Sequence, residues 1–196
     1  MGNIGNSEIS RKAIHVLSAT IPLFYIYVFN EKIEMILILS VMLIFCFFIE
    51  IARSNQAIIK MFKKYLFFMM RDFEKKGALT GATWVFVGSL FTIILVPSPF
   101  CILALFFLSF GDTFAAIIGI KYPYIKIGKK TLSGSLACFI ASVTIGLISY
   151  KEINIEILIF GALVASIVEL SSFKINDNVS IPIISGYSMY VFSIMI

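Results

Sequence analysis

The chain has 196 residues, a length typical of one domain. It carries a net charge of +5, yet charged residues make up only 14% of it and hydrophobic residues 60%, with a mean hydropathy of +1.00. A soluble domain of this size has too little interior to bury that much apolar surface. The composition excludes a soluble enzyme, a disordered tail and a nucleic-acid-binding module. It predicts an all-α, polytopic membrane protein with a single domain covering 1–196.

Seven apolar runs approach the length of about 20 helical residues that is needed to cross a bilayer. The first run contains His15 and Pro22 and lacks a clear cleavage site, so we expect a permanent anchor rather than a signal peptide. The predicted spans are about 13–29, 33–52, 79–96, 99–120, 132–150, 153–173 and 181–196.

Basic residues are distributed unevenly between the two sides of these spans. Fourteen of the 16 Lys and Arg residues fall in the N-terminus and in the second, fourth and sixth loops, whereas Lys32 and Lys151 fall on the other side. The positive-inside rule therefore predicts a cytoplasmic N-terminus, and seven spans then place the C-terminus outside. We expect an integral protein of the cell membrane.

The second loop contains a segment, 56–73, with apolar residues at helical spacing and basic residues largely on the rest of the wheel. This pattern predicts an amphipathic helix on the inner membrane surface. Its role is either to anchor and balance charge or to help lipids reach a site.

Acidic residues near the inner ends of the spans carry the main functional signal. Asp112 lies inside the fourth predicted span, where a carboxylate costs several kcal/mol unless it is paired or faces water. Glu50, Glu169, His15 and Asp177 gather at the same membrane face in the predicted topology. Asp112 is therefore either functional or part of a structural ion pair.

Small residues follow Asp112 on one helical face, namely Ala115 or Ala116 and then Gly119. They indicate either a seam for helix packing or a surface that a ligand approaches closely. The loop after this span, 121–135, ends in hydroxyl, glycine and lysine residues where the fifth span begins, and a helix N-terminus there favours an anion. The spacing does not match a Walker A motif.

The motifs resemble those of the membrane CTP-dependent lipid kinases: dolichol kinase, phytol kinase and the CTP-type diacylglycerol kinase. The resemblance runs from residue 11 to about 186, and the family is itself distantly similar to phosphatidate cytidylyltransferases. The matching pieces are Arg11-Lys12-x-x-His15, Gly77-Ala-Leu-Thr80-Gly81-Ala-Thr83, Phe110-Gly-Asp112-x-x-Ala115-x-x-x-Gly119, Lys129-Lys130-Thr131-x-x-Gly134-Ser135 and Glu169-Leu followed by Asp177-Asn178, Pro182 and Gly186.

The resemblance implies transfer of the terminal phosphoryl group of CTP to the hydroxyl of a lipid such as a polyprenol or diacylglycerol, with Mg²⁺ as cofactor. On this reading Asp112, Asp177 and Asn178 hold Mg²⁺, and Glu169 or His15 takes the proton of the lipid hydroxyl. Asp112, Asp177 and Asn178 are residues whose oxygens suit that metal, although Asn and Asp near 177 are also common turn residues. The expected nucleotide-binding residues are Arg11, Lys12, Ala115, Gly119, Lys129, Lys130, Thr131, Gly134 and Ser135.

Three other interpretations remain open from the sequence. A structural membrane protein would not need Asp112 or the Lys129-Lys130-Thr131 loop. A cytidylyltransferase would release pyrophosphate and make a CDP-lipid. A transporter would place charges toward the midplane and would usually show paired repeats.

Overall fold

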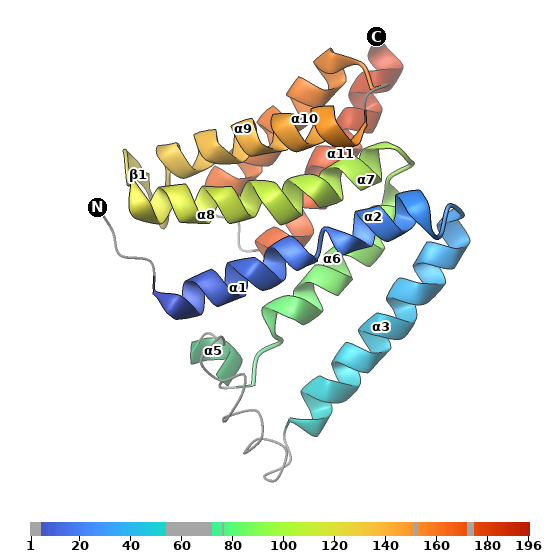
Figure 1. The fold of residues 1–196 in the computed structure, drawn as a ribbon, viewed down its shortest axis with the longest axis vertical. Coiled ribbons are helices and arrows are strands. Elements are labelled where there is room, and N and C mark those ends of the chain that lie inside the picture. Colours follow the sequence, from blue (N-terminus) through green and yellow to red (C-terminus); the bar gives the residue numbers. More distant parts are fainter. Residues whose placement is uncertain (1–4, 54–71, 76, 151–152, 172–174) are drawn as a thin grey trace.

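The computed structural model describes residues 5–53, 72–75, 77–150, 153–171 and 175–196 (Figure 1). The expected amphipathic helix at 56–73 lies almost wholly outside the described residues. The described part consists of helices and one small hairpin. The elements are α1 (Asn6–Leu17), α2 (Thr20–Tyr27), α3 (Lys32–Ala52), α5 (Asp72–Lys75), α6 (Gly81–Leu95), α7 (Phe100–Phe106), the π-helix η1 (Phe107–Gly111), α8 (Asp112–Lys121), β1 (Lys126–Ile127), β2 (Lys130–Thr131), α9 (Leu132–Ser149), α10 (Ile155–Leu170) and α11 (Asp177–Met195).

Four helical segments in the described part are long and apolar enough to cross a membrane: Lys32–Ala52, Phe100–Lys121, Leu132–Ser149 and Asp177–Met195. The other three predicted spans correspond to shorter helices. The first is divided between α1 and α2 at Ser18, while α6 and α10 have 15 and 16 residues. The all-α membrane architecture is therefore supported, and the number of seven spans stays a prediction.

The helices from α8 to α11 pack in chain order, and α6 and α3 then continue the bundle from α11. α8 contacts α9, α9 contacts α10, α10 contacts α11, α11 contacts α6, and α6 contacts α3. The segment Phe100–Lys121 is the most buried of the four candidate spans, and α3 is the least buried. In Figure 1, α1, α8 and α9 cross in front of α10 and α11, and α3 lies at the edge. The bundle is therefore built around the segment that carries Asp112.

Glycines allow two pairs of helices to approach each other closely near Asp112 and Asn178. A Cβ on Gly134 would lie 2.7 Å from the carbonyl oxygen of Ala115, and one on Gly119 would lie 2.7 Å from Thr131 Oγ1. A Cβ on Gly88 would overlap the backbone of Asn178. These contacts join α8 to α9 and α6 to the first turn of α11, in the close backbone packing that small residues permit between membrane helices.

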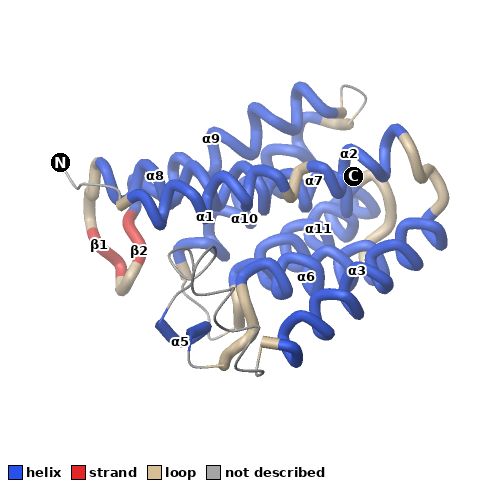
Figure 2. Tube along the Cα trace, turned by 60° about the horizontal axis from the view of Figure 1, so that its bottom comes forward, coloured by secondary structure: helices blue, strands red, loops and turns tan. Residues whose placement is uncertain are grey.

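The polar connections lie at one end of the bundle. The hairpin β1–β2 pairs Lys126 with Thr131 and Ile127 with Lys130 in antiparallel register. Figure 2 shows the hairpin at the end of α8 and α9 that lies away from the C-terminus. The predicted orientation of these ends relative to a membrane remains a prediction.

Candidate functional site

A buried ion pair connects α1 to the start of α8. Lys12 Nζ lies 2.5 Å from Asp112 Oδ2 and also donates to the backbone carbonyl of Asp112 at 3.2 Å. Both residues are only 6% exposed. A buried charge is costly without a partner. Lys12 supplies the partner that a carboxylate inside an apolar helix needs.

A second group of charges lies where the hairpin meets α10 and α11. Lys130 Nζ lies 2.8 Å from Glu169 Oε1 and 2.8 Å from Asp177 Oδ2. Glu169 is 3% exposed, and its other carboxylate oxygen is buried with no hydrogen-bond partner among the described residues. Lys130 thus ties three separate chain segments together through one ammonium group.

The charge of Lys130 is maintained by the acidic residues around it. Burial by itself would lower the pKa of Lys130, but the carboxylates of Asp112, Asp177 and Glu169 outweigh burial. Together they raise the pKa above its ordinary value of 10.5. Asp112 therefore belongs electrostatically to both groups, and Lys12, Asp112, Lys130, Glu169 and Asp177 form one charged cluster.

Asn178 connects this charged cluster to His15 and to α6. Its Nδ2 donates to the carbonyl of Gly81 at 3.1 Å, which leaves Oδ1 to accept from His15 Nε2 at 2.9 Å. The same nitrogen of His15 lies 3.5 Å from Asp112 Oδ2. Since Asn178 Oδ1 accepts, Nε2 of His15 carries a hydrogen. The other ring nitrogen, Nδ1, is buried and has no hydrogen-bond partner among the described residues.

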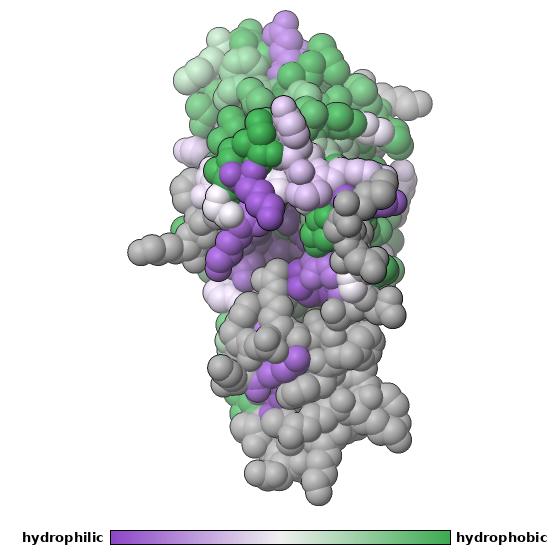
Figure 3. All heavy atoms as spheres, turned by 90° about the vertical axis from the view of Figure 1, so that its left-hand side faces the viewer, coloured by the Kyte–Doolittle hydropathy of each residue, from purple (hydrophilic) through white to green (hydrophobic). Residues whose placement is uncertain are grey.

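The charged cluster lies toward the hairpin end of the bundle. Figure 3 looks at that end and shows hydrophilic side chains gathered around a hollow, below a strongly hydrophobic surface. Lys130 and Asp177 are partly exposed, whereas Asp112 and Glu169 are buried. Lys130 and Asp177 are therefore the members of the charged cluster that a polar ligand would contact first.

A smaller polar network holds the N-terminus of α6 beside the charged cluster. Glu50 Oε1 accepts from Thr80 N and from Thr83 Oγ1, both at 2.8 Å. Its other oxygen lies 2.9 Å from the guanidinium of Arg53, three residues further along the chain. Glu74 Oε1 accepts from Gly81 N at 2.9 Å. Carboxylates thus occupy two backbone N–H groups at this helix end.

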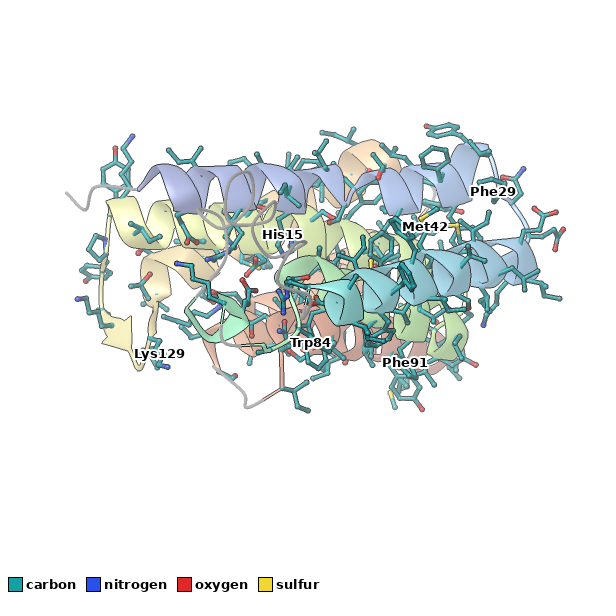
Figure 4. The ribbon with its side chains drawn as sticks, turned by 90° about the horizontal axis from the view of Figure 1, so that it is seen from below. His15, Phe29, Met42, Trp84, Phe91 and Lys129 are labelled. Atoms are coloured by element: carbon teal, nitrogen blue, oxygen red, sulfur yellow. The ribbon has the colours of Figure 1, made fainter. Side chains whose placement is uncertain are left out.

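Several predicted nucleotide-binding residues lie outside the charged cluster. Arg11 pairs with Glu8 at 2.6 Å. Lys129 is exposed at the tip of the hairpin, at a distance from His15 that Figure 4 makes clear. Ser135 is buried and donates to the carbonyl of Ser166 at 2.7 Å. Their expected roles stay predictions.

The predicted residues at the α8–α9 junction lie in a helix-packing seam. Ala115, Gly119 and Gly134 make the close contacts described above. Thr131 Oγ1 accepts from Gly134 N at 3.1 Å and caps α9. Of the two alternatives left by the sequence, this geometry favours packing for the three small residues.

The proposed Mg²⁺ ligands have suitable chemistry but are already engaged. The inward oxygens of Asp112 and Asp177 face the ammonium groups of Lys12 and Lys130, and Asn178 Oδ1 faces His15. No group of three or more His, Cys, Asp or Glu in the described part of the chain is arranged to hold a metal. The three residues are paired with Lys12, Lys130 and His15 in this arrangement, and their role in holding Mg²⁺ stays a prediction.

No sequence pattern indicates η1, the π-helix that ends immediately before Asp112. A π segment adds a residue to a helical turn and is frequent at functional sites. Here Thr113 Oγ1 donates to the carbonyl of Ser109 at 2.7 Å, and Ser109 contacts Ser18 of the first predicted span at 2.8 Å. The π segment therefore changes the direction in which the side chain of Asp112 projects from the helix.

The chain is similar to three known proteins over much of its length. It is 29% identical to the uncharacterized protein RP860 of Rickettsia prowazekii over 194 residues, 94% of each chain. It is 25% identical to the CTP-dependent diacylglycerol kinase 1 of Saccharomyces cerevisiae over 225 aligned residues, 95% of this chain and 73% of the yeast protein. The namesake from Eremothecium gossypii is 26% identical over 137 residues, 56% of this chain and 43% of that protein.

No family model matches the chain, and no solved structure matches it. The similarity to CTP-dependent diacylglycerol kinases is distant but, for the yeast protein, covers nearly the whole chain. Together with the long apolar helices, it supports the interpretation of the chain as a membrane lipid kinase.

Proposed function

We propose that the chain transfers the terminal phosphoryl group of CTP to the hydroxyl of a membrane lipid alcohol, with diacylglycerol as the first acceptor to test. The charged cluster carries this proposal, because three carboxylates and two ammonium groups from α1, α8, the hairpin, α10 and α11 are collected beside apolar helices. Charges are costly in such surroundings, and a set this large is more than packing needs. The names of the distant relatives supply the donor and the acceptor.

Phosphoryl transfer depends mainly on positioning and on neutralising charge. Lys12 and Lys130 are the ammonium groups placed to contact phosphates, by exchanging their carboxylate partners for phosphate oxygens. The charged cluster by itself carries one net negative charge, since it holds two lysines and three carboxylates. A nucleotide therefore needs further positive charge, and the hairpin presents some of it on the exposed Lys126 and Lys129.

The chemical step joins the oxygen of the lipid hydroxyl to the terminal phosphorus and breaks the bond from that phosphorus to the bridging oxygen, which leaves as CDP. The hydroxyl proton needs an acceptor. Two buried atoms without hydrogen-bond partners among the described residues, Glu169 Oε2 and His15 Nδ1, are the candidates. Asn178 orients His15 for this role by accepting from Nε2.

We also propose that the hairpin end faces the cytoplasm, where nucleotide is available. The basis is the distribution of Lys and Arg along the sequence. The whole chain would then act as one membrane-embedded kinase domain.

The test is to incubate purified protein in detergent or vesicles with terminally labelled CTP and a panel of diacylglycerols and isoprenoid alcohols. We expect label in a lipid monophosphate, and loss of that label in the Lys130→Ala variant. Lys32→Ala is the matched control, because Lys32 lies at the opposite end of the bundle and donates only to the carbonyl of Ile94 among the contacts described. Absence of labelled lipid with every acceptor would overturn the proposal. Release of the label as pyrophosphate when phosphatidate is added as acceptor would identify a cytidylyltransferase instead.

A further inference from the structure

The outer face of α8 and α9 contains a groove of about 640 Å³. Phe110, Phe114 and Ile118 form one wall at helical spacing. The other wall comes from α9, where the small side chains of Ala137 and Ala141 make room between larger neighbours. Both walls belong to candidate membrane spans.

The lining of the groove presents only apolar groups to a bound molecule. The two hydroxyl residues that line it are bonded to the backbone: Thr144 Oγ1 donates to the carbonyl of Ile140 at 2.8 Å, and Ser133 Oγ donates to that of Tyr122 at 2.7 Å. The remaining lining side chains are apolar. An occupant is therefore held by apolar contact and contributes an apolar chain.

The dimensions suit one lipid chain. The lining residues on α9 run from Ser133 to Ile148, which is about 22 Å along a helix at 1.5 Å per residue. One leaflet is about half of the roughly 30 Å hydrocarbon core, so the groove is long enough for a whole chain within a leaflet.

One end of the groove lies beside the hairpin that carries Lys130. Ser133 Oγ lies 3.2 Å from Thr131 Oγ1, and the neighbouring residue Lys130 reaches Glu169 and Asp177. The close contact of Gly134 with Ala115 closes the seam between α8 and α9, so a chain in the groove reaches the charged cluster around the hairpin end and not between the helices.

We infer that this groove binds the hydrocarbon chain of the lipid alcohol, whether fatty-acyl or isoprenoid, and presents its hydroxyl end at the hairpin. The inference rests on the proposed function for the identity of the lipid. It assigns chain recognition to α8 and α9, separate from the charged groups that act on phosphate.

The first test is binding without catalysis. A diacylglycerol with a photoreactive group in its acyl chain is cross-linked to the full-length protein in phosphatidylcholine vesicles, and the labelled peptides are identified by mass spectrometry. We expect label within 132–149, reduced by excess dioleoylglycerol and not by added phosphatidylcholine. Equal competition by phosphatidylcholine would show that the groove holds bulk membrane lipid and would overturn the inference.

The second test fills the groove. Ala141→Phe should abolish the cross-link and raise KM for dioleoylglycerol by about tenfold, equivalent to about 1.4 kcal/mol. It should leave KM for CTP and turnover of a short-chain diacylglycerol unchanged. The matched control, Leu147→Phe, lies on the same helix and is exposed outside the groove lining, so it should change none of these quantities.

The two proposals fail in different ways. Cross-linking in the groove without phosphoryl transfer to any acceptor would keep the groove and remove the kinase function. Normal transfer by Ala141→Phe with long-chain acceptors, with cross-links elsewhere, would keep the kinase and remove the groove.

Discussion

Replacing Asp112 by asparagine separates a functional role of this carboxylate from a structural one when Lys12 is changed as well. Asp112→Asn keeps the side-chain shape and removes the charge that Lys12 Nζ contacts at 2.5 Å. Lys12 is 6% exposed, so its ammonium group would remain buried beside a neutral amide. The single substitution should therefore destabilise the protein as well as reduce activity.

The expected loss follows from the geometry of the pair. Removing one member of a buried ion pair costs about 3–5 kcal/mol. The backbone carbonyl of Asp112 stays within 3.2 Å of Lys12 Nζ and still accepts a hydrogen bond, so we expect a value near the lower limit, about 3 kcal/mol. At 2–4 °C per kcal/mol for a chain of this size, Tm should fall by roughly 6–12 °C.

The double variant Lys12→Met with Asp112→Asn removes both charges, and its stability should return to within about 1 kcal/mol of the wild type. Unfolding is followed in detergent by the fluorescence of Trp84, the single tryptophan, and lipid phosphorylation is measured on the same samples. If Asp112 and Lys12 act on the substrate, the double variant regains stability without activity. Wild-type activity in the double variant would refute the functional role of the pair.

Three further changes test other parts of the structure. Because the pKa of Lys130 is raised above 10.5, its stabilising contribution should be complete below that pH and lost as the pH rises further, so the Tm difference between wild type and Lys130→Gln should shrink above about pH 10.5. Thr131→Ala should cost about 1 kcal/mol in thermal unfolding through loss of the α9 cap, and Thr131→Ser should restore it. Gly134→Ala should cost about 1–3 kcal/mol by pushing α9 away from the carbonyl of Ala115, and an unchanged Tm would contradict the seam.

The general position of the site was predictable because charges inside apolar helices are rare. Asp112 stands inside a predicted span, and Glu169 and His15 lie near the inner ends of two others. Once the spans alternate in direction, these residues must meet at one end. The structure brings them together with Lys130 and Asp177.

The pairings inside the site were not predictable from spacing. Arg11 and Lys12 are adjacent, so they lie about 100° apart on a helix, and the rotation of α1 in the bundle decides that Lys12 points to Asp112. Lys129 and Lys130 are likewise neighbours, but the turn of the hairpin exposes the first and directs the second to Glu169. Such choices depend on tertiary packing.

Two backbone features were also not predictable from the sequence pattern. The π-helix before Asp112 contains no proline and no pair of glycines that would indicate a distortion. Its hydrophobic residues have the pattern of an ordinary α-helix. The break at Ser18 divides the first predicted span, although the apolar run continues through it. The two features contact each other through the hydrogen bond between Ser18 and Ser109, which no local sequence pattern predicts.

The measurement that tests the central claim most directly compares CTP labelled at the terminal phosphate with CTP labelled at the phosphate next to the ribose. Purified protein is incubated with each nucleotide and with either dioleoylglycerol or dioleoylphosphatidate, and the extracted lipid is analysed for label. The account predicts label in a lipid monophosphate from the terminal position alone, and its loss in the double variant of Lys12 and Asp112 at wild-type stability. Label entering the lipid from the phosphate next to the ribose, or equal labelling by the double variant, would contradict it.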